Sequence, residues 1–135
     1  MTQTLKCLKA LGDATRVRLV ALLERDELSV NELQQITRLG QSRISTHLGL
    51  LQEVGLLTLR KDGKRNFYRI NPNAPAEASA CLKIALTGAP EIPEHAADLT
   101  HLKRVLAERN DQAKLYFNQV AGRFDRQYGP GRSWQ

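Results

Sequence analysis

The sequence of 135 residues contains few aromatic residues and only two cysteines. Aromatic side chains make up 5% of it, too few for a platform that stacks the bases of single-stranded nucleic acid. Cys7 and Cys81 are too far apart in the chain to indicate a disulfide framework. No apolar run approaches the ~20 residues of a membrane span, and the N-terminus has no signal-peptide segment. We therefore expect a cytoplasmic protein with no membrane partner.

A length of 135 residues fits one domain, alone or with an appendage, and the composition is sufficient for a modest core. Hydrophobic residues make up 41% of the chain and charged residues 25%, as in ordinary globular proteins. The formal net charge of +6 predicts attraction to polyanions. Charge alone does not distinguish DNA, RNA and anionic lipid as the partner.

The stretch Leu39–Leu51, LGQSRISTHLGLL, has the most informative pattern. Ile44, Leu48 and Leu51 are spaced by four and three residues, which predicts a helix with one buried side. The opposite side carries polar groups suited to base edges and phosphates in a major groove. An ordinary solvated helix face is the alternative interpretation. The candidate DNA-binding residues of this helix are Gln41, Ser42, Arg43, Ser45, Thr46 and His47.

Three shorter helices are expected before this stretch, at Leu5–Leu11, Ala14–Arg25 and Val30–Arg38. Ser29 followed by Glu32 is a capping box, which locates the start of the third helix. A turn that contains Gly40 then leads to the polar helix. Two short helices joined by such a turn are typical of a helix-turn-helix, in which the second helix enters the major groove.

The pattern changes to an alternating one after Gly55, which predicts two strands. Asp62-Gly63 between the two runs favours a tight hairpin turn. The hairpin is basic, which favours a wing that lies along DNA phosphates or in the minor groove. A solubilising edge is the alternative, because lysines often protect exposed strands. The candidate wing contacts are Arg60, Lys61, Lys64 and Arg65.

The C-terminal part predicts helices joined by a Pro-containing linker, Thr87–Pro93. One helix opens at Pro75 and runs to about Leu86, and a long one runs from His95 to about Arg123. So long an apolar stripe exceeds what this small core can cover, which favours packing on the same stripe of a second chain. The candidate dimer-interface residues are Leu5, Leu8, Leu99, Leu102, Leu106, Tyr116, Phe117 and Val120.

These elements predict a mainly α fold with a small β-hairpin, a winged helix-turn-helix with a long C-terminal dimerisation helix. We expect a DNA-binding domain over residues 1–75 and a helical dimerisation region over residues 76–124. Residues 125–135 are expected to be a flexible tail or the start of a linker to an absent domain.

With these residues placed, the chain resembles the ArsR/SmtB winged helix-turn-helix repressors. The resemblance covers about residues 5–71 and lies in LKALGDATRVRLVALL, ELSVNELQQ and GQSRISTHLGLLQEVGLLTLRKDGKRNFYRI. It implies a homodimeric repressor, not an enzyme, that binds double-stranded operator DNA and responds to a small-molecule effector. It also implies that the polar helix is the recognition helix and that the hairpin is the wing.

The sequence departs from the metal-sensing members of that family. Their third helix carries a cysteine pair, whereas Ser29 and Asn31 stand here, so a thiolate site for arsenic or cadmium is not expected. Asp98 and His101 could share a helix face as zinc ligands do, but no second pair matches, and surface polar residues are the favoured interpretation. Two cysteine thiols could meet across a dimer as a redox or metalloid site, although buried packing is favoured. We expect no metal and no cofactor.

The C-terminal third, RVLAERNDQAKLYFNQVAGRFDRQYGPGRSW, resembles the linker that joins ArsR-type domains to S-adenosylmethionine-dependent methyltransferases in some fusions. The alternative function is therefore the regulatory or docking arm of such an enzyme, although the Gly-rich nucleotide loop is absent. This resemblance also suggests an S-adenosylhomocysteine-type metabolite as the effector. A third alternative is an RNA-binding or nucleic-acid-compacting module, against which the scarcity of aromatics argues.

Overall fold

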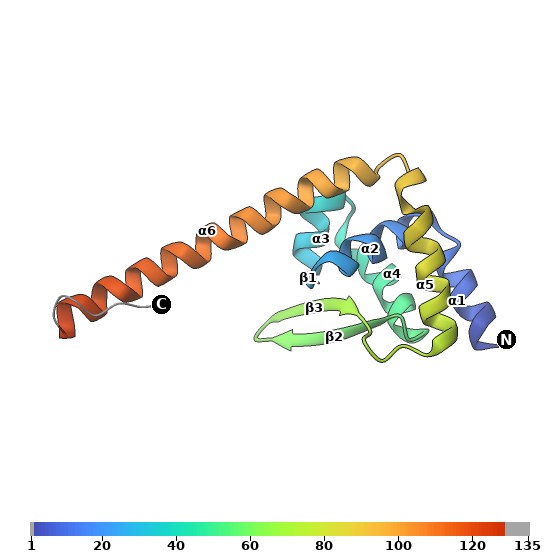
Figure 1. Cartoon of the computed structure of the whole chain (residues 1–135), viewed down its shortest axis with the longest axis horizontal. Coiled ribbons are helices and arrows are strands. Elements are labelled where there is room, and N and C mark those ends of the chain that lie inside the picture. Colours follow the sequence, from blue (N-terminus) through green and yellow to red (C-terminus); the bar gives the residue numbers. More distant parts are fainter. Residues whose placement is uncertain (1, 129–135) are drawn as a thin grey trace. The chain divides into compact units, whose positions relative to one another are not determined.

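The structure is a computed structural model that describes residues 2–128, with side chains described through residue 119. The chain divides into two compact units, with the boundary between Leu102 and Lys103. The first unit contains the helix-turn-helix and the sheet (Figure 1). Its elements are α1 (Gln3–Leu11), α2 (Ala14–Arg25), β1 (Leu28–Ser29), α3 (Val30–Thr37), α4 (Gln41–Glu53), β2 (Leu57–Asp62), β3 (Arg65–Ile70), α5 (Ala76–Gly88) and the 3-10 turn η1 (Ala89–Glu91).

The helix α6 (His95–Tyr128) begins in the first unit and forms the described part of the second. It continues past the end predicted at about Arg123, and residues 129–135 of the predicted tail lie outside the described residues. The predicted linker Thr87–Pro93 is partly wrong, because α5 extends through Gly88 and η1 follows directly. No helix in the described part of the chain combines the length and the apolar character of a membrane span.

The sheet is antiparallel, with strand order β1-β3-β2. The hairpin of β2 and β3 is confirmed, but its two-residue turn is Gly63-Lys64 because Asp62 already pairs with Arg65. Gly63 has a φ of +62°, which glycine adopts without steric cost. Strand β1 was missed by the sequence analysis. It pairs Leu28 with Tyr68 and thereby fixes the base of the hairpin against the start of α3.

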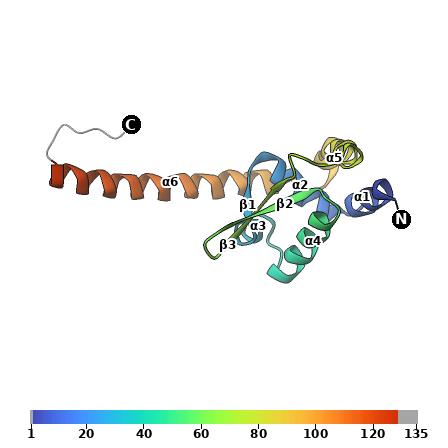
Figure 2. The same ribbon diagram turned by 90° about the horizontal axis from the view of Figure 1, so that it is seen from below.

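The core of the first unit lies between α2, α3, α4 and the sheet, and α1 and α5 pack against each other beside it. Ile44, Leu48 and Leu51 are fully buried, which confirms the predicted inner side of α4. Figure 2 shows α4 on one side of the hairpin and α5 on the other. The polar side of α4 therefore remains free while its apolar side is anchored.

The caps explain where the central helices begin and end. Ser29 accepts a hydrogen bond from the Glu32 amide, and the Glu32 carboxylate accepts one from the Ser29 amide, so the predicted capping box is confirmed. The turn after α3 differs from the expectation. Arg38 takes the left-handed conformation with φ +64°, while Gly40 has an ordinary φ of −73°. The backbone reversal before α4 is thus made at Arg38 rather than at the glycine.

A buried ion pair joins α2 to the first turn of α6. The guanidinium of Arg18 donates to both carboxylate oxygens of Asp98, from Nε at 2.8 Å and from Nη2 at 2.9 Å. Only 3% of Asp98 is exposed, so its interpretation as a surface polar residue is wrong. His101 Nδ1 lies 2.9 Å from the carbonyl oxygen of Ile36. Within the first unit, Asp98 and His101 therefore attach the first two turns of α6 to α2 and α3.

Candidate nucleic-acid interface

The polar side of α4 is accessible along its first two turns. Five of its six candidate residues are exposed, and the sixth, His47, is half-buried. Thr46 donates its hydroxyl to the Ser42 carbonyl at 2.9 Å, and Arg43 Nη2 lies 3.4 Å from the Thr15 hydroxyl. The exposed groups are hydrogen-bonding and carry no carboxylate, as a helix that lies against phosphates requires.

A polar groove of about 380 Å³ joins α4 to the wing. On one side it is lined by Gln41 and Ser45 from α4, and on the other by Lys64 and Arg65 from the hairpin. The structure thus brings together four of the ten predicted site residues in one concavity. The sequence analysis missed the other lining residues, which are Ser29, Val30, Asn31, Gln34, Asn66 and Tyr68.

His47 is connected to α2 through Arg16. Arg16 Nη1 lies 3.1 Å from His47 Nδ1, and because a guanidinium only donates, Nδ1 is the acceptor and neutral His47 carries its proton on Nε2. Arg16 Nε also donates to the Ala10 carbonyl. Burial lowers the pKa of His47; Asp13 opposes this effect, while the positive charges of Arg16 and Arg43 add to it. His47 therefore offers a neutral N–H donor at neutral pH.

Arg60 is a predicted wing cation whose guanidinium is already bound by other side chains of the same chain. Its Nη2 and Nε donate to the Glu27 carboxylate at 2.6 and 2.9 Å, and its Nη1 lies 3.7 Å from Asp62. The guanidinium also lies 4.9 Å from the centre of the Phe67 ring. Arg60 thus attaches the wing to the loop after α2. Lys61, by contrast, is an exposed residue of β2 outside the groove.

The residues considered for metal binding have structural roles. The Ser29 hydroxyl caps α3, and the Asp98 carboxylate is taken by Arg18. Among the residues that the structure describes, no group of three or more His, Cys, Asp or Glu side chains is arranged to hold a metal ion. Cys7 and Cys81 are both buried, and burial raises the pKa of the Cys7 thiol, which suits packing rather than thiolate chemistry.

Apolar side chains are exposed in both units. In the first, Leu5 and Leu8 on α1 are 54% and 48% exposed, and Ile84 on α5 is 69% exposed. In the second, Tyr116 and Phe117 on α6 are 66% and 64% exposed. Of the other predicted interface residues, Leu102 is buried within the chain, Leu99 and Leu106 are half-buried, and Val120 lies outside the residues whose side chains are described.

The helix-turn-helix of α3 and α4, followed by the hairpin, defines a winged helix-turn-helix protein. The sequence profile described as "Bacterial regulatory protein, arsR family" matches residues 13–58, which include α2 through α4. The biofilm growth-associated repressor of Agrobacterium fabrum is 33% identical over 90 residues, which are 67% of this chain and 76% of that protein. The chain belongs to the ArsR family of bacterial regulatory proteins.

Two further relatives agree with this assignment. The arsenic resistance transcriptional regulator ArsR1 of Pseudomonas putida is 42% identical over 76 residues, which are 56% of this chain but only 59% of that protein. The crystal structure of the transcriptional repressor BigR from Xylella fastidiosa superposes with a TM-score of 0.54 at 32% identity, covering 63% of this chain and 82% of BigR. These relatives are regulators, which gives no support to the methyltransferase-arm alternative.

Proposed function

We propose that this protein is a sequence-specific transcriptional repressor, without enzymatic activity, that binds double-stranded operator DNA. The observation that carries the proposal is the groove in which Gln41 and Ser45 of α4 face Lys64 and Arg65 of the wing. Amide and hydroxyl side chains on a helix N-terminus suit base edges, and the wing cations suit phosphates. The arrangement would therefore combine readout of sequence with electrostatic attachment.

We further propose that the functional form is a homodimer. The exposed Leu5, Leu8 and Ile84 support an apolar interface on the adjacent helices α1 and α5, and Tyr116 and Phe117 extend the apolar surface of α6. A symmetric dimer presents two recognition helices to half-sites about one helical turn apart. Sedimentation equilibrium tests this: we expect twice the chain mass for the wild type and a shift toward monomer for Leu5→Lys/Ile84→Lys.

The effector of this regulator is proposed to be a small molecule rather than a metal held at the start of α3. Ser29 and Asn31 occupy the positions where the family resemblance places a cysteine pair, and hydroxyl and amide groups bind soft metals poorly. The capping box of Ser29 with Glu32 gives the first of these residues a structural role instead. Arsenite or cadmium is therefore expected to leave DNA binding unchanged at concentrations that leave Cys7 unmodified.

Selection from a pool of random duplexes tests the proposed function directly. The homodimer is expected to enrich an imperfect inverted repeat with half-sites one helical turn apart. The variant Gln41→Ala/Ser45→Ala serves as the matched control, because both residues are exposed and their replacement leaves the core intact. Enrichment of no common sequence by the wild type, or of the same sequence by the variant, would contradict the proposal.

A further inference from the structure

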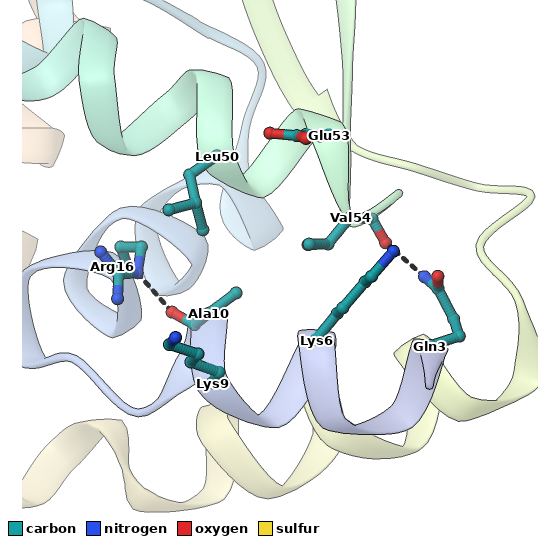
Figure 3. Close-up of a pocket in the computed structure, with 8 residues that line it drawn as sticks. All are labelled: Gln3, Lys6, Lys9, Ala10, Arg16, Leu50, Glu53 and Val54. Atoms are coloured by element: carbon teal, nitrogen blue, oxygen red, sulfur yellow. Dashed lines mark hydrogen bonds between the residues drawn. The ribbon is translucent and has the colours of Figure 1, made fainter. Parts of the chain in front are cut away.

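A second cavity, of about 340 Å³, lies between α1 and the C-terminal half of α4 (Figure 3). Lys6 and Lys9 of α1 and Arg16 of α2 give it a cationic lining. Its apolar lining comes from Ala10, Leu50 and Val54. The volume is within the range of about 300–1,000 Å³ that is usual for small-molecule sites in proteins.

The charges of this cavity favour an anion. Three cationic residues line it against one carboxylate, that of Glu53. Within the described part of the chain, the side chains of Lys6 and Lys9 make no hydrogen bond or ion pair, so both ammonium groups are available. Lys6 and Lys9 are three residues apart, which places them on the same side of α1. Two ammonium groups and a guanidinium in one cavity are suitable partners for a carboxylate or phosphate group.

The apolar lining favours an anion with an organic body over an inorganic ion. Leu50 is 36% exposed, whereas Ile44, Leu48 and Leu51 of the same helix are fully buried. Covering its side chain, together with that of Val54, would remove apolar surface from water, which favours binding. An anion with a short alkyl or aryl body would place its charged group beside the cationic residues and its apolar body against the apolar residues.

The cavity and the DNA groove lie against different faces of the same helix. Gln41 and Ser45, one turn apart, line the groove, whereas Leu50 and Val54 line the cavity. Arg16 connects the two regions, because it lines the cavity and also donates to His47 on the recognition face. An anion in the cavity would compete with His47 for the guanidinium of Arg16.

We propose that this cavity is the effector site of the protein and binds a small organic anion, a carboxylate or phosphate ester with a short apolar body. The inference rests on the DNA-binding function proposed above. The ligand draws Arg16 away from His47 and adds negative charge beside the recognition helix, so it weakens DNA binding. By linkage, DNA weakens the binding of the ligand by the same factor.

The test uses the full chain with benzoate and phenyl phosphate as probe anions. Benzamide, the uncharged analogue of benzoate, is the control for the charge of the probe. Heteronuclear NMR titration is expected to shift amides of α1 and of the end of α4 for the anions and not for benzamide. The variant Lys6→Ala/Lys9→Ala is expected to lose at least tenfold in probe affinity. Lys83→Ala on α5, also an exposed lysine, is the matched control and keeps wild-type affinity.

DNA affinity without probe is measured first, so that the two proposals fail separately. If the wild type does not bind its selected duplex, the proposed function fails whatever the probes do. If DNA binds normally but the anions do not bind, bind equally well after Lys6→Ala/Lys9→Ala, or leave DNA affinity unchanged, the effector site is refuted. If Lys6→Ala/Lys9→Ala loses DNA affinity but not probe affinity, these lysines contact DNA phosphates instead, and the proposed effector site is refuted as well.

Discussion

Arg18 in α2 and Asp98 in α6 form a two-point ion pair with both side chains buried, 80 residues apart in the chain. The Asp98 carboxylate raises the pKa of Arg18 through its hydrogen bonds, and Arg18 also donates to the Thr37 carbonyl at 3.3 Å. The pair therefore connects the start of α6 to α2 and to the end of α3. This connection lies entirely within the first unit.

Asp98→Ala is expected to destabilise the protein by about 3–5 kcal/mol, because it leaves the Arg18 guanidinium buried without its partner. Urea unfolding followed by circular dichroism measures the change. Glu94→Gln is the control: Glu94 is 3.9 Å from Arg18 and its side chain is 52% exposed, so the loss should be within about 1 kcal/mol. Equal losses for the two variants would show that burial of the pair has no special importance.

The two ends of the wing are expected to differ in DNA binding. Lys64→Ala should weaken binding to all duplexes and reduce the slope of log affinity against log salt by about 1, because it removes one phosphate contact. Arg60→Ala should leave this slope unchanged, because its guanidinium is occupied by Glu27. Fluorescence anisotropy at several salt concentrations measures both slopes. A reduced slope for Arg60→Ala with none for Lys64→Ala would reverse the assignment.

Ser45→Ala is expected to act on sequence discrimination. One base contact is worth about 1–3 kcal/mol, so affinity for the selected duplex should fall roughly 5- to 150-fold while affinity for random duplexes stays unchanged. Competition titrations with both duplexes give the ratio. Lys64→Ala provides the comparison, because it should lower both affinities together. An equal loss on both duplexes for Ser45→Ala would argue against direct readout.

The lowered pKa of His47 predicts a pH dependence of stability. The unfolded chain takes up a proton near the ordinary value of 6.5, whereas folded His47 resists it because of burial and of the neighbouring Arg16 and Arg43. This contribution to stability is therefore present above pH 6.5 and is lost as the pH falls through the lower folded value.

His47→Gln retains an acceptor for Arg16 but does not titrate, so it isolates this effect. Thermal melts between pH 7.5 and 5 should show a steeper decline for the wild type than for the variant. All other ionisable groups are common to both proteins, and parallel declines would therefore refute the predicted shift.

Features with a local signature could be predicted from the sequence. The three-and-four spacing of Ile44, Leu48 and Leu51 identifies α4, because burial of one helix side imposes that period. The Ser29–Glu32 capping box likewise depends on residues three apart. The hairpin could be predicted from Asp62-Gly63 between two alternating runs, because glycine readily adopts the positive φ of a tight turn, as Gly63 does.

Features that depend on distant residues could not be predicted. Strand β1 has two residues, and it exists because Leu28 meets Tyr68, 40 positions later. From the sequence, Arg60 resembles the other cations of the wing, because its ion pair with Glu27, 33 positions earlier, becomes visible only in the structure. The link from Arg16 to His47 depends on how α2 packs against α4, and the spacing of apolar residues in each helix does not show which of their residues meet.

The measurement that tests the central claim most directly is the ratio of Kd values for random and selected duplexes at one fixed salt concentration. If the groove between α4 and the wing reads DNA sequence, the wild type should bind the selected duplex at least about 10³-fold more tightly. The ratio should fall sharply in Gln41→Ala/Ser45→Ala. A wild-type ratio near one would contradict the account, because the basic surface would then bind DNA by charge alone.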